Sequence, residues 1–278
     1  MDLDELDIER DREGFIILKR TYSDLYKKTN YLSPVPMVIN RIYEYDIHAA
    51  NLSMLKQSGK IDPKALSILT KMDKKPREVA VGKMIRENKQ FGVIIKRGIL
   101  RAREQLFREN QLQDYEVLSI KNDAVFVIGR KLKRTTFGDV EFRLKNQYSL
   151  FQNIDKIEFY YDRRHKRIDI KGVKDEVVHH PDHQNGMLQF FLTVFNYAAM
   201  DQRDDLRDYL LDFVHRYKAK ELPYQYYREL NAANIYRTEI ELSGYGYNLE
   251  EIGQGDLGMI NPIYNYTRFI LPVIRYYL

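Results

Sequence analysis

Two aspartates occupy positions from which a β-sheet can present them together. Asp46 comes at the end of the run Arg41–Ile47, which is rich in β-forming residues, and Asp123 lies between two similar runs, residues 115–120 and 124–128. Phosphoryl transfer from a nucleoside triphosphate uses two divalent cations about 4 Å apart, which carboxylates on neighbouring strands commonly hold. We therefore take Asp46 and Asp123 as candidate catalytic residues and metal ligands, with Mg²⁺ or Mn²⁺ as the cofactor.

Each aspartate also has a simpler interpretation. Asp46 precedes a predicted helix that its side chain can cap, and Asp123 belongs to the polar tip of a predicted hairpin, where Asp is a common turn residue. Taken one at a time, these local roles are the more common fate of such residues. The order and context of the surrounding motifs favour the catalytic interpretation.

The elements that position these aspartates can be predicted from local patterns. The prolines of residues 33–36 indicate an extended entry to the first strand, and Ala49–Leu52 is typical of a turn into a helix. Residues 78–110 lack proline and carry apolar residues at helical spacing, which predicts a long helix or a helix pair. Several further strands are expected between Phe137 and Lys174.

The pattern changes beyond Gly186. Residues 187–199 and 204–217 are predicted to be helical, and the rest of the chain is rich in tyrosine with several glycines. The sequence therefore predicts an α+β fold with a lobe boundary near residues 180–186.

Four short segments resemble the palm motifs of family B DNA polymerases, in the order of that family. Residues 46–55 (DIHAANLSML) are similar to the first motif, D-x-x-S-L-Y-P-S-I-I, and residues 88–92 (NKQFG) to the second, N-S-x-Y-G. Residues 119–124 (SIKNDA) resemble the third, Y-G-D-T-D-S, with Asp123 at its metal-binding aspartate. Residues 170–173 (IKGV) resemble the lysine-glycine segment that contacts duplex. The resemblance covers about residues 40–175.

The resemblance implies a nucleotide site and a nucleic-acid surface. The implied nucleotide-binding residues are Asn51, Lys83, Arg86, Asn88, Phe91 and Lys121. The implied primer-template contacts are Tyr160, Tyr161, Arg163, Arg164, Arg167, Lys171 and Gly172. Solvated surface charge is the alternative fate of the basic helix residues.

Three departures from the family pattern matter for function. Lys121 stands at the place of the third motif's first aspartate, where it would weaken metal binding or contact phosphate. Met84 replaces the second motif's triphosphate-binding lysine, while Lys83 lies one residue earlier and about 100° around the helix. Asn51 replaces the tyrosine that rejects a 2′-hydroxyl, which opens the question of ribonucleotide use; a neighbouring aromatic, Phe91 or Tyr45, is the alternative gate.

The implied architecture is a minimal, phage-like polymerase. We expect a palm-like antiparallel sheet with helices in residues 1–180, very small fingers at about residues 55–90, and a helical, thumb-like lobe in residues 181–278. The segment before Asp46 is too short for a proofreading exonuclease.

Two other functions remain open from the sequence. One is a catalytically inactive, polymerase-like subunit of a replication or transcription complex that binds nucleic acid, and the other is an unrelated α+β protein with accidental motif matches. His179, His180 and His183 are residue types that can ligate zinc, but no distal ligand pair accompanies them, so a polar loop explains them as well.

Composition sets the remaining bounds. Lys and Arg number 45 against 40 Asp and Glu, a net charge of +5 that suits nucleic acid and nucleoside triphosphates as partners. The chain has no cysteine, which excludes a disulfide framework and favours a reducing compartment. Neither a secretory signal nor a long apolar run is apparent, so we expect a cytoplasmic protein without a membrane partner.

Overall fold

The computed structural model describes residues 8–10, 16–18, 22–172, 181–222, 229–231 and 262–278. The chain forms two compact units. The first comprises Met1–Pro34 and Arg41–Gln147, and the second comprises Val35–Asn40 and Tyr148–Leu278. Each unit holds part of two long strands, β4 (Met37–Ile47) and β8 (Val140–Ile154).

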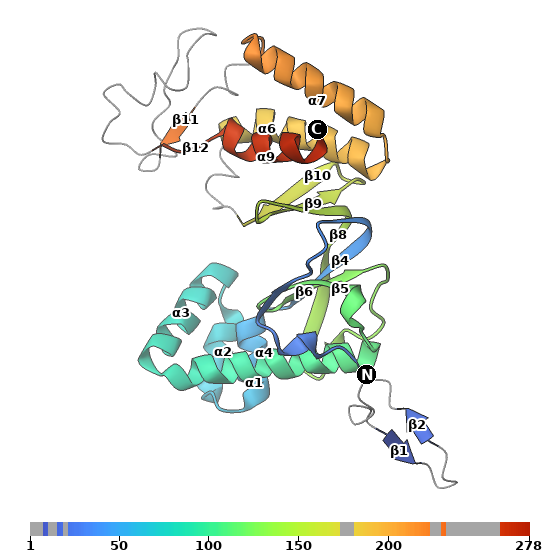
Figure 1. Cartoon of the computed structure of the whole chain (residues 1–278). Helices are drawn as coiled ribbons and strands as arrows, with labels where there is room; N and C mark the ends of the chain where they lie inside the picture. Colours follow the sequence, from blue (N-terminus) through green and yellow to red (C-terminus); the bar gives the residue numbers. More distant parts are fainter. Residues whose placement is uncertain (1–7, 11–15, 19–21, 173–180, 223–228, 232–261) are drawn as a thin grey trace. The chain divides into compact units, whose positions relative to one another are not determined.

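Short strands, helices and a hairpin make up the rest of the first unit (Figure 1). In chain order its elements are β1 (Ile8–Arg10), β2 (Ile16–Leu18), η2 (Asp24–Lys27), β3 (Asn30–Leu32), α1 (Ala50–Ser58), α2 (Pro63–Lys71), α3 (Lys74–Glu87), α4 (Lys89–Asn110), η3 (Asp114–Glu116), β5 (Val117–Lys121), β6 (Ala124–Ile128) and β7 (Thr136–Phe137). The second unit adds β9 (Ile157–Asp162), β10 (Arg167–Lys171), α6 (Pro181–Ala199), α7 (Arg203–Lys218), β11 (Glu229–Asn231), β12 (Pro262–Asn265) and α9 (Tyr266–Tyr277).

The main sheet has the strand order β10-β9-β8-β4-β6-β5-β3, and β7 pairs with β8. The registers of β10 with β9, β9 with β8, β4 with β6, β6 with β5 and β5 with β3 are all antiparallel. Antiparallel strands combined with helices make this an α+β fold, as the sequence predicts.

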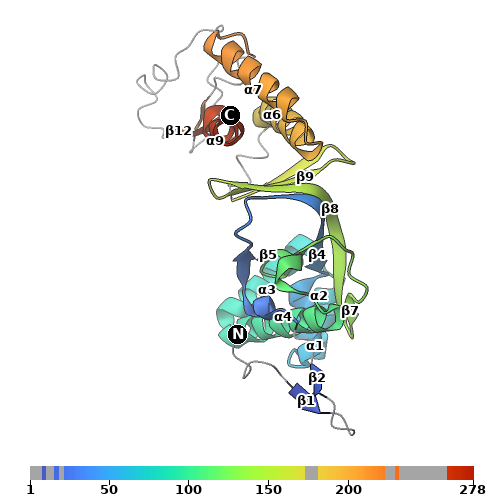
Figure 2. The same ribbon diagram turned by 45° about the vertical axis from the view of Figure 1, so that its right-hand side comes forward.

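Successive side chains of β4 point to opposite faces of the strand. Tyr43, Tyr45 and Ile47 are buried in a hydrophobic cluster with residues of α1 and α4. Glu44 and Asp46 alternate with them and therefore project from the other face of the strand. In both views the helices α1 to α4 lie together on one side of β5 and β6 (Figures 1 and 2).

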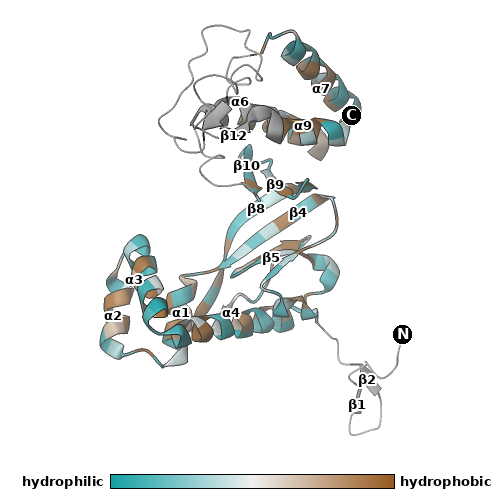
Figure 3. Ribbon diagram, turned by 60° about the vertical axis from the view of Figure 1, so that its left-hand side comes forward, coloured by the Kyte–Doolittle hydropathy of each residue, from teal (hydrophilic) through white to brown (hydrophobic). Residues whose placement is uncertain are grey.

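The packing of α1 on α4 depends on a glycine. A Cβ atom at Gly98 would lie 2.5 Å from Sδ of Met54, so the absence of a side chain lets the two helices approach closely. Along α4, apolar residues that face the core alternate with polar ones, as Figure 3 shows. Helix α1, which carries Asn51, is thereby held next to the end of β4.

The region 78–110 forms a helix pair. Asn88 breaks the helix with extended φ and ψ angles of −139° and 102°, and its side chain accepts a hydrogen bond from the backbone N–H of Gln90. This interaction is an N-cap for α4. Of the two possibilities left open by the sequence, the pair is the one observed.

The second unit has its own aromatic core. Phe159 and Tyr161 of β9 pack with Phe191 and Phe195 of α6, and residues of α7 and α9 complete the cluster. The strands expected between Phe137 and Lys174 and the two helices expected after Gly186 are all present, although α6 begins earlier than predicted, at Pro181.

The division into units differs from the predicted lobe boundary. The units divide within β8, between Gln147 and Tyr148, whereas the sequence placed the boundary at residues 180–186. The reason is that β9 and β10 share a core with α6, which no local composition change records. Whether these parts act as palm, fingers and thumb stays a prediction.

The glycine-rich segment 232–261 lies outside the described residues.

Candidate active site

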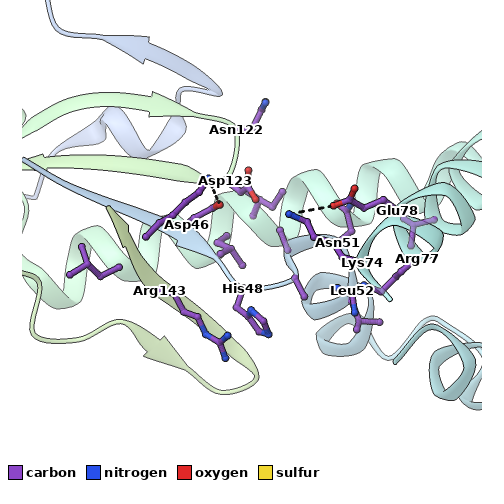
Figure 4. A pocket seen from close by; sticks show the side chains of 17 residues that line it. Asp46, His48, Asn51, Leu52, Lys74, Arg77, Glu78, Asn122, Asp123 and Arg143 are labelled. Atoms are coloured by element: carbon purple, nitrogen blue, oxygen red, sulfur yellow. Dashed lines mark ion pairs between the residues drawn. The ribbon is translucent and has the colours of Figure 1, made fainter. Parts of the chain in front are cut away.

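The strand pairing brings Asp46 and Asp123 together. Asp46 of β4 lies opposite Ala124 of β6, the residue next to Asp123. Lys121 also pairs with Ala124, which closes the β5–β6 hairpin with Asn122 and Asp123 as its two-residue tip. Asn122 has a φ of 53°, a left-handed conformation that Asn tolerates well. The close-up in Figure 4 shows the side chains of Asp46 and Asp123 near each other at one edge of a pocket.

The two carboxyl groups interact electrostatically. Burial and the negative charge of Asp46 raise the pKa of Asp123 to about 6, against the opposing effects of its own backbone N–H and of Lys145. Oδ1 of Asp46 is buried and has no hydrogen-bond partner among the residues that the structure describes. A buried carboxylate oxygen without a partner is costly, so this pair of side chains favours a bound cation.

One lysine already supplies part of this positive charge. The Nζ atom of Lys145, on β8, lies 3.6 Å from Oδ2 of Asp46 and 3.7 Å from Oε1 of Glu44. Glu44 is 1% exposed, and its Oε2 accepts a hydrogen bond of 2.6 Å from Asn146. The side chain of Lys145 is 55% exposed. Lys145 thus lies close to both the buried carboxylate of Glu44 and the more accessible carboxylate of Asp46.

A cavity of about 690 Å³ opens beside the two aspartates. Its wall comes from the end of β4, the start of α1, helix α3, the hairpin tip and residues 143–145 of β8 (Figure 4). Positive side chains in the wall are Lys74, Arg77, Arg143 and Lys145. Glu78 also lines the cavity, and its Oε1 lies 3.9 Å from Nζ of Lys74. Asp46 and Asp123 beside several cations are an arrangement that suits a metal-bound polyphosphate.

A buried arginine on α4 interacts electrostatically with Asp123. Arg103 of α4 is 3% exposed, and its Nη1 donates to the backbone carbonyl of Lys28 at 2.5 Å. Burial lowers the pKa of Arg103 to about 10, although the carboxylate of Asp123 acts in the opposite direction. Arg103 was not predicted as a neighbour of the site, because a single arginine on an apolar helix face gives no local signal in the sequence.

The two aspartates are ligands of the kind that Mg²⁺ prefers. Asp46 and Asp123 offer oxygen ligands, and Oδ1 of Asp46 lacks any other partner in the described part of the chain. No group of three or more His, Cys, Asp or Glu suited to a metal occurs among the described residues. Mg²⁺ usually keeps several waters and is bound by one or two carboxylates together with substrate phosphates. Asp46 and Asp123 are thus the side chains that would hold it.

The structure brings only one of the six predicted nucleotide-binding residues to this cavity. Asn51 lines it, from the first turn of α1. Lys83 lies 3.8 Å from Glu87 in an exposed ion pair, Asn88 caps α4, and Phe91 packs on the hydrophobic cluster. These three, together with Arg86 and Lys121, are not among the residues that line the cavity.

The positively charged residues that do line the cavity were not among the residues predicted from the sequence. Lys74 and Arg77 lie on the first turns of α3, on the same helical face as Val81, which also lines the cavity. Lys83 is nine residues beyond Lys74, about 180° around the helix. Positions 74, 77 and 81 are spaced so that they share one face of a helix, and this spacing could have indicated that Lys74 and Arg77 point the same way. Arg143 and Lys145 are brought in by β8 from far along the sequence.

The predicted nucleic-acid contacts all lie in the second unit. Tyr160 and Tyr161 are buried, and Lys171 lies over the Tyr160 ring, 5.6 Å from its centroid. Arg163, Arg164 and Arg167 are exposed at the β9–β10 turn and the start of β10. Gly172 has a φ of 89°, which explains the glycine by backbone conformation.

The predicted histidine cluster falls mostly outside the part of the chain that the structure describes. His179 and His180 lie outside the described residues, and His183 belongs to α6 at a position whose side chain is not described.

The fold and the cavity together define an α+β protein with a two-carboxylate site. The family model described as bacteriophage PBS1 gene 130 protein matches residues 21–278. This match covers well over half of the chain, so the chain belongs to that family of phage proteins, in agreement with the phage-like character that we expected. A comparison with curated proteins finds no match. None of the described helices is long and apolar enough to cross a membrane.

Proposed function

We propose that the chain is a template-directed nucleotidyltransferase of the DNA polymerase type, with a palm-like sheet that carries Asp46 and Asp123. The observation that supports this most directly is the meeting of a strand-end carboxylate and a hairpin-tip carboxylate at a cavity with a cationic wall. The reaction would join the hydroxyl oxygen at a primer end to the α-phosphorus of a nucleoside triphosphate, releasing pyrophosphate and the hydroxyl proton.

The chain's own residues have distinct tasks in this proposal. Asp46 and Asp123 would hold Mg²⁺, which when bound supplies Lewis-acid stabilisation of the charge on the phosphates. Lys74 and Arg77 on α3 and Arg143 on β8 would bind phosphate oxygens and so orient the substrate. Asn51 would lie near the sugar.

The exposed arginines of the second unit are the proposed nucleic-acid contacts. Arg163, Arg164 and Arg167 share one turn and the strand that follows it. Cations on such a surface bind the phosphate backbone and release counterions, which makes the affinity depend on salt.

Primer extension with Mg²⁺ or Mn²⁺ tests the catalytic proposal. Asp46→Ala and Asp123→Ala should each lower the rate at least about a thousandfold, because a metal contributes several kcal/mol and each 1.4 kcal/mol is about tenfold. Circular dichroism should show that both variants keep the fold. Equal incorporation by the wild type and both variants would refute the catalytic proposal.

A second candidate is an inactive, polymerase-like subunit that binds nucleic acid. It is favoured by the ion pair of Lys145 with Asp46 and by Lys121 in place of a motif aspartate. This candidate predicts salt-sensitive binding of primer-template that is weakened by Arg163→Ala with Arg164→Ala, but no extension with either metal. Extension that depends on Asp46 and Asp123 would exclude it.

A further inference from the structure

Lys145 occupies a position at which it must compete with any cation on Asp46. Its Nζ is 3.6 Å from Oδ2 of Asp46, and a Mg²⁺ bound to this carboxylate would lie about 2.1 Å from the ligating oxygen. The ammonium group and the metal would therefore be only a few ångströms apart, where like charges repel strongly in a partly buried site. Both cannot occupy the same side of Asp46 without a cost.

Glu44 is a second ion-pair partner for Lys145. Its carboxylate is buried and held by Asn146, so it is not accessible as a metal ligand in the way that Asp46 is. Lys145 lies 3.7 Å from Glu44 and is more than half exposed, so it can leave Asp46 while keeping a partner. The same side chain lines the cavity in which we place the triphosphate.

From this geometry we infer that Lys145 is a built-in counter-ion of the site, a positioning residue that opposes the binding of a divalent metal alone and favours its entry together with polyphosphate. Lys145 neutralises Asp46 in the empty site. A metal-bound polyphosphate replaces this charge on Asp46 and offers its own oxygens to the displaced ammonium group. The inference rests on the proposed function, since it concerns how that site loads.

Mn²⁺ titrations followed by electron paramagnetic resonance test the inference without any turnover. Lys145→Met should bind Mn²⁺ alone about tenfold more tightly than the wild type, which is within the usual size of a coupling between two bound ligands. With tripolyphosphate present, the order should reverse, so that the wild type binds the Mn²⁺–tripolyphosphate complex more tightly. Lys145→Arg, which keeps the charge, should retain the weak binding of Mn²⁺ alone.

Arg143→Met is the matched control. Arg143 lies two residues earlier on β8 and lines the same cavity, but it pairs with Glu141 at 2.7 Å and makes no ion pair with Asp46 among the described contacts. Its loss should change the affinity for Mn²⁺ alone by less than about twofold. If Lys145→Met folds poorly, Lys145→Gln makes the same measurement with a polar side chain.

Two outcomes separate this inference from the proposed function. If Mn²⁺ binding depends on Asp46 but is equal or weaker in Lys145→Met, the counter-ion role is wrong while the metal site stands. If Asp46→Asn leaves Mn²⁺ binding intact in both backgrounds, the metal site itself is wrong, and the proposed function falls with it.

Discussion

Arg77 and Lys83 lie on the same helix, α3, yet only Arg77 lines the cavity beside the two aspartates. Lys83 forms its ion pair with Glu87 on another face of the helix. The two residues therefore offer a comparison between a cation in the site and one outside it, with the same charge removed from the same element.

Arg77→Ala should raise KM for the nucleoside triphosphate about tenfold or more, because it removes a charge-assisted contact to phosphate. Lys83→Ala should leave KM within about twofold, since exposed charges away from a site have little effect. Steady-state kinetics of both variants on one primed template make the comparison. Equal effects of the two substitutions would place the triphosphate elsewhere.

Asp123→Asn should abolish activity and yet stabilise the metal-free fold. Burial and the charge of Asp46 raise the pKa of Asp123 to about 6, above the ordinary value of an aspartate. Ionisation therefore costs stability as the pH rises through about 4 to 6, and the wild type loses stability over this range. We expect the variant to be more stable by about 1 kcal/mol at pH 7, after allowance for partial exposure.

Urea unfolding in the presence of a chelator measures this difference. At a pH below about 3, which is well under the ordinary pKa of Asp, the Asp123 carboxyl is largely protonated in both the folded and the unfolded state, so the two proteins should have similar free energies of unfolding. A variant that is less stable than the wild type at pH 7 would show that Asp46 and Asp123 do not repel each other.

Asn51→Tyr tests whether Asn51 is the sugar gate. None of the described residues that line the cavity is Phe, Tyr or Trp. Tyr45 is buried and its hydroxyl accepts a hydrogen bond from the backbone of Leu132, while Phe91 packs on the hydrophobic cluster. The tyrosine should therefore introduce a clash with a 2′-hydroxyl and reduce ribonucleotide use while largely sparing deoxyribonucleotides.

The measurement is the ratio of kcat/KM for the two sugars. Each tenfold change in this ratio corresponds to about 1.4 kcal/mol of differential transition-state binding. An active Asn51→Tyr enzyme with an unchanged ratio would mean that the register of the first motif is wrong.

Gly172→Ala should destabilise the second unit more than Gly129→Ala destabilises the first. The φ angles are 89° and 87°, so the intrinsic strain of an alanine is similar. A Cβ at Gly172 would lie 2.5 Å from the carbonyl oxygen of Lys156, while Gly129 has no atom within 4 Å. Thermal or urea unfolding should show a loss above about 1 kcal/mol for Gly129→Ala and a clearly larger loss for Gly172→Ala. Equal losses would mean that the Lys156 contact relaxes freely.

The local part of the fold was predictable from the sequence. The β-forming run that ends near Asp46 and the polar tip between β5 and β6 place the two aspartates at a strand end and a hairpin tip, because strand propensity and turn chemistry are encoded by neighbouring residues. The cap at Asn88 had a similar local basis, although only the structure shows that it separates two helices.

The cationic side of the site was not predictable in the same way. Lys145 reaches Asp46 because β8 lies next to β4 in the sheet, and strand order is a property of the whole fold. Arg103 becomes an ionic neighbour of Asp123 only after α4 packs on the sheet. The family resemblance implied nucleotide-binding roles for Lys83, Arg86 and Lys121. These residues carry charge but are not among the residues that line the cavity.

The pairing of Asp46 with Ala124 also determines which length changes the gene can tolerate. One residue inserted into β4 before Asp46 would shift the strand by one position and turn the aspartate toward the cluster that holds Tyr45. Two inserted residues would restore the original side. Natural insertions and deletions in this strand should therefore come in even numbers of residues. The loop between α1 and α2 should accept odd and even numbers alike, because a loop has no two-residue repeat.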